Sequence, residues 1–311
     1  MDLLQIKIYL ANHGITKWIY QWKEERKEKK IRAMSDEEYA HWKYHLRTGR
    51  KLNLENPQTF DERVWYLKIN VRDPLNNQCS DKYRVREYVK KCGLGHILNE
   101  LYGKYQSVEE IVWNDLPDRC FLKCNHGSGT NMIFDRSKPF DFEKFQEKFS
   151  RALKEDYYWA GREWNYRHIK PYILCEKILE DKNGKLPLDY KLMCFAGEPK
   201  LLFLDIGVAA ENGCHAEEYY RNIYDLDFKL LPVKETRENY LGEEIQKPKN
   251  WDKMVEYARI LSKPFRHCRV DLYNIDGEIY FGEITFHHGG GCNDIQPEEW
   301  AVKMGQWIPI D

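Results

Sequence analysis

The stretch that decides the fold of this chain is CRVDLYNIDGEIYFGEITFHHGGG, residues 268–291. Two apolar runs rich in β-branched and aromatic residues flank Asp276-Gly277, a dipeptide typical of the tight turn in a β-hairpin. Each arm of the hairpin carries one embedded acid, Asp271 in the first and Glu283 in the second. Mg²⁺ prefers carboxylate oxygens, usually one or two from the protein together with nucleotide phosphates. The hairpin is therefore a candidate magnesium site.

The length of the turn decides whether the two acids share a face. A three-residue turn places Asp271 directly opposite Glu283, with Thr285 on the same face, whereas a two-residue turn puts the carboxylates on opposite faces. The metal hypothesis therefore requires the three-residue turn. The glycines after His287 and His288 allow the backbone to approach a ligand closely. We expect these histidines to be surface or substrate-side residues, because no third ligand has zinc-like spacing.

A second motif, FLKCNHGSGTNMI, occupies residues 121–133. It predicts a strand that ends at Lys123, followed by a loop containing Gly127, Ser128 and Gly129 and then by a second apolar strand. Small residues let backbone N–H groups approach a phosphate chain, and a lysine just upstream adds positive charge. The spacing matches neither the P-loop nor the dinucleotide-binding fingerprint. An ordinary hairpin turn is the alternative interpretation.

A third motif, YILCEKIL, covers residues 172–179 and places Glu176-Lys177 inside an apolar strand, with Asp189 and Lys191 following a DKNG turn. Charged groups inside a buried strand are unfavourable unless they have a partner. A bound nucleotide could be that partner: strand backbone groups would read the adenine edge, a carboxylate would accept from ribose hydroxyls, and lysine would meet phosphate. An edge strand with its charges in water is the alternative.

The remaining sequence predicts an α+β architecture without internal repeats. We expect two helical stretches in residues 1–50, a helix capped by Thr59, and a helix capped by Ser80 that ends at Gly93. Two amphipathic helices should begin near Asp141 and Asp252. The predicted strands are 119–124, 172–179, 189–196, 199–206, 268–275 and 279–286.

Composition and charge restrict the class of protein. The chain has 311 residues, of which 42% are hydrophobic, so it can bury a sizeable core in one multi-lobed enzyme or in two to three packed lobes. Lys+Arg 49 against Asp+Glu 50 leaves a net charge of -1, which provides no bulk attraction to nucleic acid. The basic run from Lys23 to Lys30 is most simply a solvated helix face, and a weak contact with a membrane surface or an acidic partner is the alternative.

Localisation and redox state follow from two absences in the sequence. No run of 18 or more apolar residues occurs and the N-terminus does not resemble a signal peptide, so we expect a cytoplasmic protein. The 9 cysteines include no C-x-x-C pair, which favours reduced, mostly buried thiols over a metal cluster.

The order of the motifs resembles the ATP-grasp superfamily: a glycine-rich loop led by lysine, a strand with Glu-Lys, then D-x-K, then a D…E-x-T hairpin. Upstream, NPQTFDERVWYLKI (56–69) and SDKYRVREYV (80–89), together with E-I-T-F…G-G-G, resemble the TupA-like ATP-grasp family, which is associated with bacterial surface-polysaccharide and teichuronopeptide synthesis. The resemblance covers about residues 36–300.

This resemblance implies a fold and a chemistry. The fold would be two α+β lobes gripping ATP after a helical N-terminal region, divided into residues 1–105, 106–175 and 176–311. The chemistry would be an ATP- and Mg²⁺-dependent ligase reaction, in which a carboxylate attacks the γ-phosphate and an amine then displaces phosphate from the acyl phosphate to form an amide. The carboxylate would belong to a sugar acid of a capsule or surface polysaccharide, and the amine to an amino acid or another amine.

The resemblance also implies roles for individual residues. Nucleotide binding would involve Lys82, Lys123, Gly127, Ser128, Gly129, Glu176, Lys177, Asp189 and Lys191. Asp271 and Glu283 would bind Mg²⁺, with Thr285 standing where an asparagine ligand is usual. Arg221, Arg269 and Lys191 would act on the acceptor carboxylate or the acyl phosphate, although a structural ion pair is an equal alternative for each arginine.

Three other functions stay open on the sequence alone. An ATP-grasp kinase of a sugar or lipid-linked hydroxyl would use the same nucleotide motifs. A non-catalytic scaffold is disfavoured, because buried acids without a function are unfavourable to keep. A glycosyltransferase of polysaccharide synthesis is suggested only by the polysaccharide context.

Overall fold

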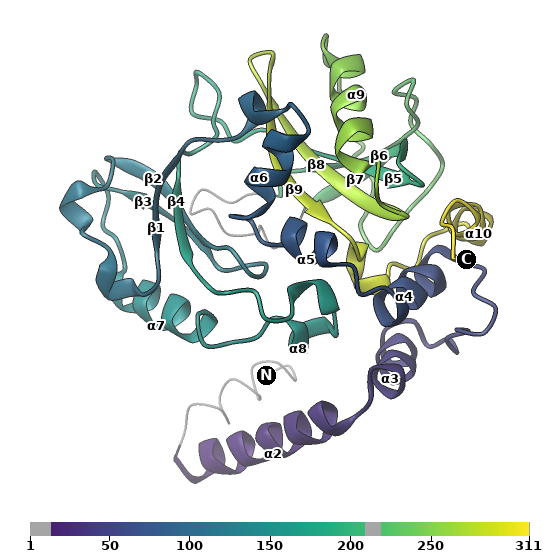
Figure 1. The fold of residues 1–311 in the computed structure, drawn as a ribbon, viewed down its shortest axis with the longest axis horizontal. Coiled ribbons are helices and arrows are strands. Elements are labelled where there is room, and N and C mark those ends of the chain that lie inside the picture. Colours follow the sequence, from purple (N-terminus) through teal and green to yellow (C-terminus); the bar gives the residue numbers. More distant parts are fainter. Residues whose placement is uncertain (1–13, 209–218, 311) are drawn as a thin grey trace. The chain divides into compact units, whose positions relative to one another are not determined.

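The computed structural model describes residues 14–208 and 219–310, in which the chain forms two compact units, residues 1–52 and 53–311 (Figure 1). The described part of the first unit consists of α2 (Gly14–Ala33) and α3 (Asp36–Thr48). Ser35 caps α3 by accepting from the Glu38 N–H, while the Glu38 carboxylate accepts from the Ser35 N–H. The two predicted helical stretches are thus confirmed, apart from residues 1–13, which lie outside the described residues.

The second unit contains seven α-helices in its described part. They are α4 (Phe60–Asn70), α5 (Pro74–Ser80), α6 (Val85–Lys91), α7 (Phe142–Ala152), α8 (Tyr158–Gly161), α9 (Trp251–Ser262) and α10 (Glu298–Gln306). Short 3₁₀ turns connect several of them: η1 (Gly95–Ile97), η2 (Val108–Glu110), η3 (Trp113–Asp115), η4 (Trp164–Tyr166) and η5 (His288–Gly291).

Most of the predicted helix ends are confirmed. Thr59 caps α4 by accepting from the Glu62 N–H, and Asp141 caps α7 by accepting from the Lys144 N–H at 2.9 Å. Asp252 lies in the first turn of α9, one residue inside its start, and does not cap it. Gly93 follows α6 in the left-handed conformation, with φ 78°.

The predicted cap at Ser80 is wrong. Ser80 is the last residue of α5, and its hydroxyl donates to the Asn76 carbonyl at 2.8 Å. The helix α5 is itself not predicted from the sequence. It begins at Pro74, because Asp73 accepts from the Leu75 N–H and Pro74 occupies the first helical position.

A four-stranded antiparallel sheet has the order β1-β4-β2-β3. Its strands are β1 (Leu101–Tyr105), β2 (Arg119–Cys124), β3 (Asn131–Asp135) and β4 (Ile173–Glu176). Phe145 and Phe149 of α7 share one buried cluster with Leu122 and Phe134 of the sheet. Of these strands, β2 and β4 are predicted from the sequence, β4 being shorter than expected, and β3 is the apolar strand expected after the glycine-rich loop. The short strand β1 is not predicted.

A five-stranded antiparallel sheet has the order β7-β6-β5-β8-β9. Its strands are β5 (Asp189–Phe195), β6 (Glu198–Ile206), β7 (Tyr220–Tyr224), β8 (His267–Ile275) and β9 (Glu278–Thr285). Four of the five are predicted to within a residue at each end, and β7 is missed. The α+β class expected from the sequence is confirmed.

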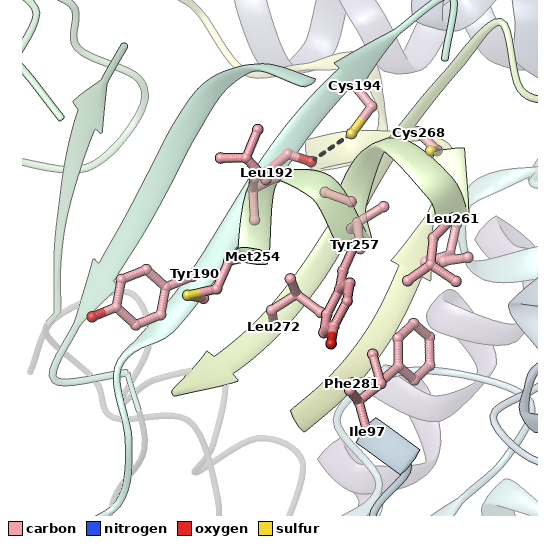
Figure 2. Close-up of a cluster of buried hydrophobic side chains, with 14 of the residues drawn as sticks. Ile97, Tyr190, Leu192, Cys194, Met254, Tyr257, Leu261, Cys268, Leu272 and Phe281 are labelled. Atoms are coloured by element: carbon pink, nitrogen blue, oxygen red, sulfur yellow. Dashed lines mark hydrogen bonds between the residues drawn. The ribbon is translucent and has the colours of Figure 1, made fainter. Parts of the chain in front are cut away.

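The two faces of this sheet have different environments. On one face, Tyr190, Leu192 and Leu272 form a buried cluster with Met254 and Leu261 of α9 (Figure 2). On the other face, Met193, Phe195 and Phe203 pack with apolar residues of α4 and α10. Because side chains alternate along a strand, Asp189 and Lys191 lie on the same face as Met193. This second face is therefore apolar at one end and charged at the other.

Three sequence expectations can be compared with the whole described chain. Within residues 14–208 and 219–310, no helix has both the length and the apolar character needed to cross a membrane. Eight cysteines are free thiols and six of these are buried, while Cys214 lies outside the described residues. No group of three or more His, Cys, Asp or Glu side chains in the described part is arranged to hold a metal. The division into residues 1–105, 106–175 and 176–311 stays a prediction.

Candidate functional site

A cleft of about 220 Å³ lies between the two sheets of the second unit. Residues of β2, β3 and β4 line one side, residues of β5, β8 and β9 line the other, and the segment 177–187 joins the two. Its apolar lining includes Phe121, Ile133, Ile178, Leu179, Leu186, Pro187 and Phe281. Four of the residues expected to bind a nucleotide also line it, namely Lys123, Glu176, Lys177 and Asp189.

Lys123 and Glu176 form an ion pair inside this cleft. The Lys123 Nζ lies 2.7 Å from Glu176 Oε2, and both side chains are largely buried. Phe121 is the partner of Glu176 in the register of β2 and β4, so Lys123, two residues further along β2, reaches Glu176 diagonally. The embedded charges of these strands thus have a partner within the protein, which neither sequence interpretation anticipated.

The backbone just beyond β4 contains N–H groups that form no hydrogen bond with the described residues. Lys177 is saturated, because its N–H donates to the Glu100 carbonyl at 3.0 Å and its carbonyl accepts from the Asn99 side chain at 2.8 Å. The next two residues, Ile178 and Leu179, line the cleft, and their N–H groups have no partner among the residues that the structure describes. Buried or half-buried N–H groups without partners are rare and favour a ligand or water at that position.

The hairpin β8–β9 has a two-residue turn and not the three-residue turn that the metal hypothesis required. Ile275 pairs with Glu278, and the turn residues Asp276 and Gly277 have φ 52° and 91°, as a type I′ turn requires. Asp271 nevertheless lies directly opposite Glu283, because the register shifts by one residue between Asp271 and Leu272. Gly282 is the extra residue of this β-bulge.

The sequence contains a signal for this bulge. The buried residues of β9 and its extension are Ile279 and Phe281 before Gly282, and Ile284 and Phe286 after it. The apolar positions therefore change from odd to even numbers across Gly282. This change indicates one extra residue in the strand, so that the apolar side chains before and after it point to the same face of the sheet.

Arg269 bridges the two acids of the hairpin. Its Nη2 lies 2.6 Å from Asp271 Oδ2 and 2.9 Å from Glu283 Oε1. Thr285 donates to Glu283 Oε1 at 2.7 Å, and Lys82 Nζ lies 3.7 Å from Glu283 Oε2. Burial alone would raise the pKa of Glu283, but the Lys82 ammonium and the Arg269 guanidinium hold it at about 2. The two carboxylates thus converge on a single cationic position.

Lys191 lies among three acids on the same face of the sheet. Its Nζ contacts Asp189, lies 3.3 Å from Asp271 Oδ2, and lies 3.7 Å from Asp205 Oδ2. Asp189 uses only one carboxylate oxygen in this contact, and its Oδ1 is buried with no hydrogen-bond partner among the residues that the structure describes. Burial is the main reason that the pKa of Asp189 rises to about 6. Because Asp189 lines the cleft, this oxygen is available to a ligand donor.

Arg221 belongs to a separate buried network behind these residues. It forms a bidentate pair with Asp205, at 2.5 and 2.8 Å, and a further contact with Glu235. Glu235 also contacts His288 at 3.2 Å, and His288 in turn lies 2.9 Å from Arg269 Nη1. Neither Asp205 nor Glu235 is among the residues singled out in the sequence. Asp205 had a detectable signal, a single charge in the apolar run LLFLDI, whereas Glu235 had none.

The glycine-rich loop is connected to the hairpin acids through one residue. Lys82 Nζ, which lies near Glu283, also donates to the Gly127 carbonyl. A Cβ at Gly127 would lie 2.6 Å from the ring of Tyr157, so the loop packs too closely there for any other residue. Gly127, Ser128 and Gly129 do not line the cleft, although the loop joins two strands that do.

The site thus has a cleft between two antiparallel sheets, with Lys123 on one wall and Gly282 on the other. Asp271 and Glu283, the two acids that share Arg269, lie on either side of this bulge residue. The chain belongs to the family described as TupA-like ATPgrasp, which it matches over residues 62–309. The expected ATP-grasp fold is confirmed on this ground. No curated protein sequence matches the chain at a significant level.

Solved structures show partial similarity. D-alanine–D-alanine ligase from Bacillus anthracis has 15% identity and a TM-score of 0.38, over 67% of this chain and 57% of that one. L-amino acid ligase from Bacillus licheniformis has 11% identity and a TM-score of 0.43, over 74% and 48%. D-alanine–D-alanine ligase from Helicobacter pylori has 13% identity and a TM-score of 0.44, over 82% and 69%. The chain spans about half the length of the two Bacillus ligases.

Proposed function

We propose that this protein is an ATP- and Mg²⁺-dependent ligase that joins a carboxylate to an amine through an acyl phosphate. The observation that carries the proposal is the position of the apolar cleft, which is lined by Gly282 and Asp189 and so borders the convergent acids Asp271 and Glu283. A nucleotide whose base lies in the apolar part of the cleft would extend its phosphates toward these acids.

The cleft supports specific nucleotide contacts. The apolar side chains would hold the adenine ring, and the partnerless N–H groups of Ile178 and Leu179 would meet its polar edge. The partnerless Oδ1 of Asp189 would accept from a ribose hydroxyl. Lys123 would contact the phosphates after release from Glu176. We also assign Lys177 to the nucleotide site. The loop from Gly127 to Gly129 and Lys82 would lie near the phosphates of the nucleotide.

The hairpin suits Mg²⁺ chemically. Asp271 and Glu283 provide carboxylate oxygens that already converge on one cationic group, and Thr285 adds a hydroxyl oxygen beside them. Two protein carboxylates with nucleotide phosphates are a usual magnesium environment. When bound, the ion would neutralise charge that develops on the phosphates during transfer. Glu283 keeps 35% of its side-chain surface exposed, which leaves an approach to the site.

The cations of the site have separate proposed roles. Arg269 and Lys191, on adjacent strands of the charged face, would bind the acceptor carboxylate and stabilise the acyl phosphate. Arg221 is instead bound by Asp205 and Glu235, so we assign it the role of positioning this face and not of contacting substrate. This corresponds to the structural ion pair that the sequence left open as an equal alternative to clamping the substrate.

The substrates are proposed from the family association. The acceptor would be the carboxylate of a sugar acid from a capsule or surface polysaccharide, and the donor an amino acid or another amine. A cytoplasmic location, where ATP is abundant, fits this reaction. The α2 helix exposes Arg26, Lys27, Lys29 and Lys30, which supports a weak contact with an anionic membrane surface.

The test is the identity of the products formed from ATP with uronic acids and amino acids as substrates. ADP and phosphate, together with a hydroxamate when hydroxylamine replaces the amine, would support the acyl-phosphate route. ADP without phosphate, and with a phosphorylated sugar, would identify a kinase. AMP and pyrophosphate would refute both.

A glycosyltransferase has little structural support. Such an enzyme would need a pair of acids at D-x-D spacing, for which Asp225 and Asp227 are the candidates in this sequence. However, Asp225 accepts from the Lys229 N–H at 2.8 Å within a turn after β7, and neither acid lines the cleft.

A further inference from the structure

A second, smaller pocket of about 100 Å³ lies beyond the end of the hairpin. Its lining comes from α4, from the segment 71–76 that leads into α5, from residues 264–267 and from the two residues Phe286 and His287. These last two directly follow Thr285, the final residue of β9, and α5 lies beside β9 (Figure 1). The pocket is thus adjacent in the chain to the residues proposed for phosphate chemistry, but it shares no lining residue with the cleft.

His267 presents a buried acceptor atom in this pocket. The side chain is 3% exposed, and its Nδ1 lies 2.8 Å from the Cys194 carbonyl, so Nδ1 carries the proton and donates. Nε2 is then a hydrogen-bond acceptor, and it is buried with no hydrogen-bond partner in residues 14–208 and 219–310. Burial lowers the pKa of His267 to about 3, which keeps the ring neutral. A donor from a ligand or water would satisfy this atom.

Three further polar side chains on the pocket have unused hydrogen-bonding capacity. Asp73 Oδ1 accepts from the Leu75 N–H at 2.8 Å, so the other carboxylate oxygen, Oδ2, can accept a hydrogen bond from a ligand. Neither the guanidinium of Arg266 nor the side-chain amide of Asn76 has a partner within the described part of the chain. Asp73 and Arg266 therefore flank the same small space at the protein surface, and neither forms an ion pair with a described residue.

The rest of the lining is apolar. Leu67 and Val71 contribute from α4 and its end, and Pro264, Phe265 and Phe286 contribute from the other side. Such walls suit a short aliphatic group. A pocket lined by a negative group, a positive group, a neutral acceptor and aliphatic surface is complementary to a small molecule that carries both an ammonium and a carboxylate.

We infer that this pocket binds a small free α-amino acid, with its ammonium on Asp73 and His267 Nε2, its carboxylate on Arg266, and its side chain against the apolar wall. Its role rests on the proposed ligase function: the bound amino acid is the amine that attacks the acyl phosphate. In that step the C–N bond forms and the acyl C–O bond breaks. Hydrogen phosphate leaves with one proton of the ammonium, and a second proton passes to solvent.

The binding is tested directly, without turnover. Calorimetry would measure the affinity of the full chain for glycine, L-alanine and L-serine, with acetate and methylamine as probes that carry one charge each. We expect at least one of the three amino acids to bind more tightly than either single-charge probe. Asp73→Asn keeps the oxygen that caps α5 but removes the charge, and Arg266→Gln removes the cation. Each should weaken that binding about tenfold or more while leaving ADP affinity unchanged.

Matched controls lie on the surface of the same unit. Asp252→Asn and Arg259→Gln alter charges that are 98% and 46% exposed on α9 and should not change amino acid binding. If no amino acid of the panel binds, or if the two pocket variants bind as the wild type does, the inference is overturned and the pocket holds only water. Binding that depends on Asp73 and Arg266 in a protein without ligase products would refute the proposed function instead.

Discussion

Asp271 and Glu283 face each other across the β8–β9 hairpin because Gly282 is inserted between them and the turn. With the two-residue turn alone, Glu283 would lie opposite Val270 and would point into the apolar cluster under α9. The bulge turns the Glu283 side chain to the opposite face of the sheet. Both carboxylates therefore lie on the charged face, where each contacts Arg269. One glycine thus determines whether the proposed metal site exists.

Replacing that glycine should therefore damage the site more than the fold. A Cβ at Gly282 would lie 3.0 Å from the Asp271 carbonyl and 3.1 Å from the Tyr273 ring, so Gly282→Ala pushes the two strands apart at the acids. We expect kcat/KM to fall by up to about 10²-fold, since misplacement of about 1 Å has effects of that size. The melting temperature should change little. Glu278→Ala, an exposed change on the same strand, is the control, and equal activity in both variants would contradict this role of the bulge.

Glu283→Gln removes one negative charge and keeps the shape of the side chain. If Asp271 and Glu283 hold Mg²⁺ between phosphates, this variant should lose turnover far more than nucleotide affinity, because the ion acts mainly where charge develops. We expect a folded protein that binds ATP but is nearly inactive, with raised Mg²⁺ restoring part of the rate. Steady-state kinetics over a magnesium series, together with ATP calorimetry, would measure both effects. An unfolded variant with normal activity per folded molecule would show that the acid is structural.

Lys123 and Lys177 should contribute to nucleotide affinity. Lys123→Ala and Lys177→Ala should each weaken ATP binding by about 1.5–3 kcal/mol through loss of a charge-assisted phosphate contact. Since Lys123 also pairs with Glu176, the double variant Lys123→Met/Glu176→Gln separates loss of the phosphate contact from an uncompensated buried acid. Calorimetry would measure the affinities. Lys182→Ala, an exposed change in the neighbouring turn, is the control, and wild-type affinity in both single variants would refute the assignment.

The network around Arg221 should make stability depend on pH. Burial opposes ionisation of Glu235, but His288 and Arg221 lower its pKa to about 2 from an ordinary 4.5. Between these two values the unfolded chain binds more protons than the folded one, so stability rises with pH. The contribution, roughly 3 kcal/mol, is fully present above pH 4.5 and is lost as the pH falls toward 2.

Glu235→Gln should remove this dependence. The variant should be less stable than the wild type at pH 7, and the difference should shrink as the pH falls from 4.5 to 2. Urea unfolding at several pH values would measure it. Glu238→Gln alters a 74% exposed acid on the same segment and should have little effect. A difference between Glu235→Gln and wild type that is constant with pH would contradict the proposed ionisation.

Local pattern by itself determines much of this protein. The strands β2, β5, β6, β8 and β9 follow from apolar runs between turn residues, and the caps at Thr59 and Asp141 follow from side chains that compete for the first helical N–H groups. Even the bulge is encoded locally, in the change of apolar phase from Phe281 to Ile284. Such features depend on neighbours within a few residues, so the sequence displays them.

The partners of the charged residues were decided only by the tertiary structure. Lys123 meets Glu176 because β2 and β4 are adjacent, and Arg221 meets Glu235 because the segment that follows β7 folds back against that strand. Asp73 and Arg266, nearly two hundred residues apart, line one pocket for the same reason. Coulomb attraction depends on distance in space, and strand order and loop path set that distance without leaving a periodic signal in the sequence.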